Sequence, residues 1–415
     1  MRTPLLAFAA SLMLAGFASA ATINVPADYP TIQGAIDASS NGDTIAIDAG
    51  TYFENNIDPT AKAIVISGAT NTDGTPGVTI DGGSGSSGSV LICSSGETPD
   101  TVFENLVITG GWSGTGAGMH NSGSSPTIVN CVFTENEAYL SGGGMWNYQS
   151  SPSLVNCHFL DNVAELSGGA MNNYDNSNPT FNGCTFVNNT SLKYQAGGVN
   201  IESCSPTFID CEFRDNTSPT WGGGLFVWDG EPILESCTFT GNSALSGGGM
   251  SNYEGGNSSL TDCSFTGNIA SYGGGMRSDN CSPTLENCTF LNNTVDGTYG
   301  YGGGMANYQC NASVTNCTFM SNTALTQGGG IYSFECIPSI MGSTFCANDP
   351  THIDGDWSDE GGNEFNDDCP VDCDGDINGD GTVNVNDLLA VIAGWGDPYN
   401  VDDLLIVIGG WGPCP

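Results

Sequence analysis

Basic residues are almost absent from this sequence. Its 415 residues include five lysines and arginines against 45 aspartates and glutamates, which gives a formal net charge of −40 at pH 7. This balance argues against a nucleic-acid partner, because phosphate binding needs clustered lysine and arginine side chains. Such acidity suits a calcium-rich exterior. The cations beyond the N-terminal segment are scattered, at Lys62, Lys193, Arg214 and Arg277.

Long apolar runs are also lacking after the first twenty residues. Residues 1–20 combine one arginine, an apolar run and the small-residue end Ala18-Ser19-Ala20, which is the pattern of a secretory signal peptide. The apolar run is too short for a membrane span, and no later run qualifies. The sequence therefore predicts a secreted or cell-surface protein with no membrane span.

What the sequence has instead is a repeat of about 26 residues between Cys131 and Phe345. Each copy holds a glycine triplet followed by an apolar residue, then Cys-x-Phe, then an asparagine three residues after the phenylalanine. The Cys-x-Phe motif starts at positions 131, 157, 184, 211, 237, 263, 288 and 317. The units are too short for paired helices, and their apolar and polar residues alternate as in β-strands. We predict an all-β parallel β-helix solenoid, with one repeat in each turn.

Stacked turns place every repeated position in a column along the rod, with about 4.8 Å between neighbours. We expect the cysteine and phenylalanine columns to fill the core. The asparagine column should lie in a turn, with its amides hydrogen-bonded along the axis. The glycines allow positive φ at a sharp corner and close approach of adjacent turns. Before the repeats, Thr31 is a candidate N-cap for a short helix that buries Ile32, Ala35 and Ile36 and caps the first turn.

Cysteines number 17, but eight belong to the repeated column, where we expect buried free thiols. None shows zinc spacing with histidine. A second column leaves one disulfide open among Cys281, Cys310 and Cys336, because adjacent turns bring Cα atoms within bonding range. The cysteines outside the regular columns are better disulfide candidates, and we expect the pairs Cys346–Cys369 and Cys373–Cys414.

These sequence motifs resemble those of known β-helix proteins. The opening through Thr51-Tyr52 resembles the start of pectin-lyase-like right-handed β-helix proteins. The Gly-Gly-Gly-Met and Asn-Cys-Thr-Phe words are similar to polymorphic outer-membrane-protein-type repeats and other secreted bacterial β-helix proteins. The resemblance covers residues 22 to about 365 and implies a right-handed fold rather than an activity. We expect a signal peptide at 1–20, a right-handed parallel β-helix at 21–368 and a small helical, EF-hand-like module at 369–415.

The last of these segments contains a calcium-type loop between Asp376 and Asp387. Oxygen-bearing side chains at loop positions 1, 3, 5 and 12, with glycine at position 6, match the EF-hand pattern. Calcium is therefore the expected cofactor. Its predicted ligands are Asp376, Asn378, Asp380, Thr382 through its carbonyl, and Asp387.

Leu388-Leu389 after this loop resembles a dockerin type I repeat, which implies docking to a cohesin-like partner protein. A dockerin has two such units, whereas here the second, from Asn400, keeps the helix and has lost the start of its loop. We therefore expect one calcium site rather than two, and this departure weakens the cohesin prediction.

One further column carries the candidate binding residues. Three residues after the methionine position, it contains the aromatic residues Tyr148, Tyr174, Trp228, Tyr253 and Tyr308. Acids and amides follow at the next position, where Asp229 and Glu254 fall on adjacent turns. If the aromatic side chains face outward, a polysaccharide can lie along them. The alternative is that the aromatics pack over a corner and the polar column is merely solvated.

Two functions follow. The chain is either a non-catalytic, polysaccharide-binding or structural β-helix module, or a polysaccharide lyase or glycoside hydrolase of the pectin-lyase-like fold. Asp229 and Glu254 are the candidate acids for hydrolysis, because a close carboxylate pair suits a retaining glycosidase. A lyase would need a basic residue near calcium-binding acids, and the cations of this sequence are scattered. The sequence also contains no catalytic motif of the pectin methylesterases. The regular columns favour the binding module.

Overall fold

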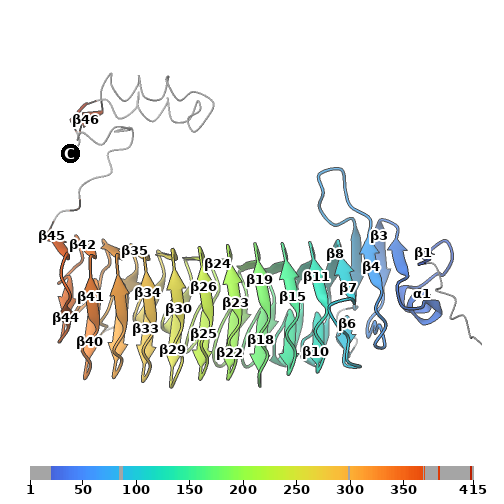
Figure 1. Ribbon diagram of the computed structural model, residues 1–415, viewed down its shortest axis with the longest axis horizontal. Helices are drawn as coiled ribbons and strands as arrows, with labels where there is room; N and C mark the ends of the chain where they lie inside the picture. The colour runs from blue at the N-terminus through green and yellow to red at the C-terminus, as the bar shows by residue number, and fades with distance from the viewer. Residues whose placement is uncertain are drawn as a thin grey trace, which may run out of the picture.

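Short β-strands stack into the long rod drawn in Figure 1. This computed structural model describes residues 20–83, 87–297, 300–367, 369, 382–383 and 412–413. Strands one repeat apart pair in parallel, as Met145 does with Met171, so the repeat length sets the register of the stack. The predicted parallel β-solenoid is confirmed.

Three parallel sheets run along the rod. Sheet 1 contains β1 (Thr22–Val25), β2 (Thr44–Ile47), β4 (Val65–Gly68), β7 (Val102–Glu104), β11 (Thr127–Val129), β15 (Ser153–Val155), β19 (Thr180–Asn182), β23 (Thr207–Ile209), β26 (Ile233–Glu235), β30 (Ser259–Thr261), β34 (Thr284–Glu286), β38 (Ser313–Thr315), β41 (Ser339–Met341) and β44 (Ser358–Asp359). Sheet 2 contains β3 (Gly50–Phe53), β5 (Val78–Asp81), β8 (Leu106–Thr109), β12 (Val132–Thr134), β16 (His158–Leu160), β20 (Thr185–Val187), β24 (Glu212–Arg214), β27 (Thr238–Thr240), β31 (Ser264–Thr266), β35 (Thr289–Leu291), β39 (Thr318–Met320), β42 (Thr344–Cys346) and β45 (Glu364–Asn366).

Sheet 3 carries the candidate site. It contains β6 (Leu91–Cys93), β10 (Met119–Ser122), β14 (Met145–Tyr148), β18 (Met171–Tyr174), β22 (Val199–Glu202), β25 (Leu225–Trp228), β29 (Met250–Tyr253), β33 (Met276–Asp279), β37 (Met305–Tyr308), β40 (Ile331–Phe334) and β43 (Ile353–Asp354). Smaller parallel sheets line one corner, formed by β9 (Trp112–Thr115), β13 (Glu137–Ser141), β17 (Val163–Ala164) and β21 (Thr190–Ser191), and by β28 (Ser243–Ser246), β32 (Ile269–Tyr272) and β36 (Thr294–Val295).

A ladder of phenylalanine rings runs through the core. From Phe133 to Phe365, neighbouring rings stack with centroids 4.6–5.2 Å apart, close to the spacing of the turns. The cysteine column is buried beside them as free thiols, as predicted, and burial raises the pKa of Cys131 to about 12. In the second column Cys281 and Cys310 are also thiols, with their sulfur atoms 3.1 Å apart.

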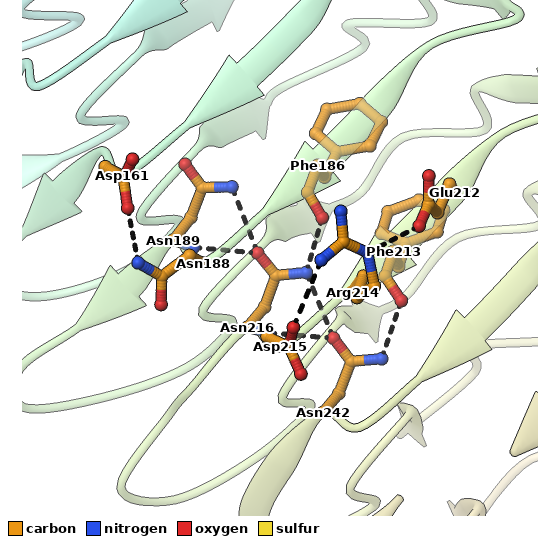
Figure 2. Close-up of polar contacts among 10 residues, drawn as sticks. All are labelled: Asp161, Phe186, Asn188, Asn189, Glu212, Phe213, Arg214, Asp215, Asn216 and Asn242. Carbon is orange, nitrogen blue, oxygen red and sulfur yellow. Dashed lines mark hydrogen bonds and ion pairs between the residues drawn. The ribbon is translucent and has the colours of Figure 1, made fainter. Parts of the chain in front are cut away.

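The asparagine column forms the predicted amide ladder, part of which Figure 2 shows. At Asn216, Nδ2 donates to the Phe186 carbonyl at 2.8 Å and to Asn242 Oδ1 at 3.0 Å. Its Oδ1 accepts from both the backbone N–H and the Nδ2 of Asn189, each at 3.0 Å. The same bonds recur from Asn136 to Asn348. Each amide therefore satisfies buried backbone groups in the adjoining turns.

The first and second glycines of each triplet are needed for different structural reasons. In Gly247-Gly248-Gly249 the first glycine has a φ of +63°, so it forms the predicted corner. The second has no positive φ, but a Cβ placed on it would lie 2.4 Å from the carbonyl oxygen of Gly274 in the next turn. Glycine is required there by the close approach of two backbones.

Both ends of the stack agree with the predictions. Helix α1 (Ile32–Ala38) follows the N-cap Thr31, whose side chain accepts a hydrogen bond from the Gly34 N–H, and it packs against the first turn through its buried face. At the other end β43, β44 and β45 make a last irregular turn, and Cys346 is disulfide-bonded to Cys369. Beyond it, β46 (Thr382–Val383) pairs antiparallel with β47 (Gly412–Pro413).

Candidate functional site

The outer face of sheet 3 gathers the candidate binding residues. Strand residues alternate inward and outward, so the methionine position is buried while the fourth residue of each strand faces outward. The strand register aligns these fourth residues in one line, which we call the outer column: Ser122, Tyr148, Tyr174, Glu202, Trp228, Tyr253, Asp279, Tyr308 and Phe334. All five aromatic residues predicted from the sequence lie in it.

Aromatic residues of the outer column pair with one another at two places. Tyr148 stacks on Tyr174 with centroids 6.0 Å apart, and Tyr308 stacks on Phe334 at 5.0 Å, so these rings cover part of each other's faces. Between the two stacks the column is interrupted by Glu202 and by the buried Asp279. Among the described aromatic residues of the outer column, Trp228 is the one that pairs with no other ring.

A groove opens at the Glu202 break. Its cavity of about 350 Å³ is lined by Tyr174, Glu202, Ser203, Trp228, Asp229 and Glu254. Tyr174 is 44 % exposed and Trp228 is 42 % exposed, and within residues 87–297 no other ring stacks on Trp228. A second cavity of about 360 Å³ shares Trp228 and Glu254 with the first. We refer to the two cavities together as the Trp228 groove.

The second cavity contains residues that the repeat alone did not reveal. Gln195 and Trp221 line it together with Phe226, Trp228, Tyr253 and Glu254. Trp221 lies just before its glycine triplet, where Tyr272 and Tyr301 occupy the equivalent places of later turns. That recurrence of aromatic residues immediately before the triplet was the available signal.

The two candidate acids lie side by side in the groove. Both follow the last residue of a sheet 3 strand in the left-handed region, with a φ of +51° for Asp229 and +37° for Glu254. The residues that directly follow the outer column form a column of their own. Elsewhere in it the acids accept from amides of the preceding turn, as where Gln309 Nε2 donates to Glu335 Oε2 at 2.6 Å. Asp229 and Glu254 are the column's only adjacent acids among residues 149–335, since the sequence places Ser203 before them and Asn280 after them.

The cations pair with other acids or with backbone carbonyls, and one of them, Arg277, lies at the edge of the Trp228 groove. Among residues 20–83, 87–297 and 300–367, Lys193 and Arg214 pair with surface acids, and Lys62 donates to backbone carbonyls. Arg277 pairs with Asp279 at 2.9 Å, and its guanidinium carbon lies 5.1 Å from the Trp221 ring centroid. The three carboxylates of the groove, Glu202, Asp229 and Glu254, therefore have no ion pair within the described chain.

Polar groups contact the acids of the groove and of the adjoining turn. Asn200 Nδ2 donates to Glu202 Oε1 at 2.8 Å, which positions that carboxylate. The hydrogen bond that Glu254 accepts from Tyr253 raises the pKa of that phenol, and the negative charge of Asp175 raises the pKa of Tyr148. Both phenols therefore remain protonated at neutral pH and are able to donate hydrogen bonds.

The predicted calcium loop lies outside the described residues, apart from Thr382 in β46. The Cys373–Cys414 pair and most of the signal peptide fall outside them as well. In the parts of the chain that the structure describes, no group of three or more histidine, cysteine, aspartate or glutamate side chains is placed to hold a metal ion.

A family model for the right-handed β-helix region matches the sequence twice, over residues 56–232 and 197–349. The chain belongs to the right-handed β-helix family. The matched ranges span the turns that carry the outer column and the Trp228 groove, so the groove is a feature of the β-helix itself. No curated protein sequence matches this β-helix protein.

The solved structures to which this chain is similar have low sequence identity with it. A tailspike protein of Acinetobacter baumannii bacteriophage Fri1, a capsular polysaccharide depolymerase, is 13 % identical with a TM-score of 0.41; the match covers 84 % of this chain and 62 % of the tailspike. A mannuronic acid specific polysaccharide family 6 lyase from human gut microbiota is 13 % identical with a TM-score of 0.41, covering 82 % and 92 %. The A-module of a mannuronan C-5 epimerase from Azotobacter vinelandii is 14 % identical with a TM-score of 0.34, covering 81 % and 92 %.

Helices long and apolar enough to cross a membrane are absent from the described part of the chain.

Proposed function

We propose that this protein is an exported β-helix module that binds polysaccharide in the Trp228 groove. The observation that carries the proposal is the break in the outer column, where Tyr174 and Trp228 expose ring faces beside carboxylates. Pyranose rings present a C–H face that packs on aromatic rings, and their hydroxyls donate to carboxylates. The signal-peptide pattern predicted for residues 1–20 supports export.

The groove residue with the largest expected contribution is Trp228. Replacing it by alanine (Trp228→Ala) removes an exposed ring that other rings leave uncovered, so we expect glycan affinity to fall about tenfold or more. A panel of soluble oligosaccharides identifies the ligand, and isothermal titration calorimetry then compares the variant with the parent.

Phe53 provides the matched control, because it is an exposed aromatic residue (77 %) on sheet 2 rather than sheet 3. Phe53→Ala should bind as the parent does. Equal affinity of all three proteins would contradict the groove assignment, and failure of the parent to bind any glycan would contradict the function.

The alternative function is hydrolysis of the bound polysaccharide. It is favoured by one observation, the adjacency of Asp229 and Glu254 within the groove, since a close pair of carboxylates is the machinery of retaining glycosidases. Incubating each bound glycan with the protein and sizing the products tests this. Shortened chains that disappear with Glu254→Gln would establish the hydrolase, whereas intact chains support the binding module.

We propose further that residues 369–415 form a calcium-stabilised, dockerin-like docking tail. The spacing of Asp376, Asn378, Asp380 and Asp387 supports it, because a flexible loop of oxygen ligands suits calcium. Titrating calcium by calorimetry should give one site in the parent and none in Asp376→Ala. Equal calcium binding by the two proteins would remove the assignment.

A further inference from the structure

The interval between Tyr174 and Trp228 has the dimensions of a slot for one sugar ring. The two residues stand two turns apart in the outer column, with Glu202 between them. Two turns correspond to about 9.6 Å along the rod. A ring held between two aromatic faces at van der Waals contact needs about 7–8 Å. At this spacing of the turns there is room for one pyranose between Tyr174 and Trp228, above Glu202.

The charge of the slot determines what kind of sugar it favours. Glu202, Asp229 and Glu254 line one cavity, and no cation of the described chain pairs with them. The buried Asn200 holds the Glu202 carboxylate in place from below through its Nδ2. The exposed ring faces of Tyr174 and Trp228 attract cations as well. A polyuronate would bring further negative charge into this site, which repulsion disfavours.

We propose that the slot selects a positively charged amino sugar, a 2-amino-2-deoxy unit within a polysaccharide. The ring packs between Tyr174 and Trp228, and its ammonium group is held by Glu202 with Asp229 and Glu254 nearby. This inference rests on the proposed polysaccharide-binding function and adds the charge class of the ligand.

Two oligosaccharides that share one backbone, and differ in whether the 2-amino group is free or acetylated, test the selection. Chitosan hexamer is cationic, and its N-acetylated counterpart, chitohexaose, is neutral with the same backbone. By calorimetry at pH 6 and low salt, we expect the parent to bind the chitosan hexamer about tenfold more tightly, with the preference shrinking as salt rises. Glu202→Gln keeps the shape of the slot and removes one charge, so it should lose most of the preference.

Controls separate the slot from the overall acidity of the chain. Glu335→Gln makes the same change outside the groove, two turns beyond Asp279, and should retain the full preference. Oligolysine, a polycation without sugar rings, should compete poorly with the chitosan hexamer. Equal displacement by oligolysine, or equal loss of preference in both glutamine variants, would overturn the proposal.

Two further outcomes separate amino-sugar selection from polysaccharide binding itself. If chitohexaose binds as tightly as the chitosan hexamer in a Trp228-dependent way, the amino-sugar proposal fails and polysaccharide binding stands. If neutral, cationic and anionic oligosaccharides all fail to bind, the proposed function fails with it.

Discussion

Replacing Asn216 by alanine should destabilise the solenoid by about 4 kcal/mol. The substitution deletes an amide that is fully buried and makes four hydrogen bonds to three other residues. The Phe186 carbonyl and the Asn189 N–H then remain buried without those partners, and each such group costs about 1–3 kcal/mol. Figure 2 shows that both partners lie on adjoining turns, so the loss weakens the stacking itself.

Urea unfolding followed by circular dichroism measures this effect, with the transition midpoint and slope both recorded. Asn182→Ala is the matched control, because Asn182 lies exposed at the end of β19 and its side chain makes no hydrogen bond within the described residues. We expect the control to stay within about 0.5 kcal/mol of the parent. A variant at Asn216 that is no less stable than the control would show that the amide ladder contributes little.

The second large effect is expected at Gly248. Its φ lies outside the positive range that alanine avoids, but the new Cβ would lie 2.4 Å from the Gly274 oxygen and 2.6 Å from the Ile269 oxygen. Both contacts are backbone atoms of the next turn, which cannot rotate away as a side chain can. The turns must separate locally, and we expect Gly248→Ala to lose about 3 kcal/mol or more, above the usual cost of overpacking.

Gly267 distinguishes this steric effect from the general cost of replacing glycine. It has a φ of +62° and open space where a Cβ would lie, so Gly267→Ala should lose only the left-handed backbone penalty of about 1 kcal/mol. Urea midpoints and soluble yields of the two variants provide the comparison. If Gly248→Ala proved the milder change, the close approach of the turns would not be what requires glycine.

Much of the fold was predictable because each turn packs mainly on near copies of itself. The Cys-x-Phe motif places Phe239 between Phe213 and Phe265. Because one repeat makes one turn, the repeat length sets the parallel register without any long-range information. The asparagine ladder and the glycine corner follow from the same periodicity. The disulfide between Cys346 and Cys369 was predictable because both cysteines lie outside the columns.

The Trp228 groove required coordinates. The sequence placed Tyr174, Glu202 and Trp228 in one column, but ring stacking and exposure depend on which neighbour fills each space, and Glu202 leaves one space unfilled. The connection that carries Trp221 varies in length between turns, so the aromatic residues before the glycine triplet recur in the sequence, but the cavity that Trp221 lines with Trp228 is defined only by the coordinates. Repetition thus specifies the rod, because identical turns make identical contacts, whereas the binding face arises from the departures from repetition, whose contacts exist only after the turns are stacked.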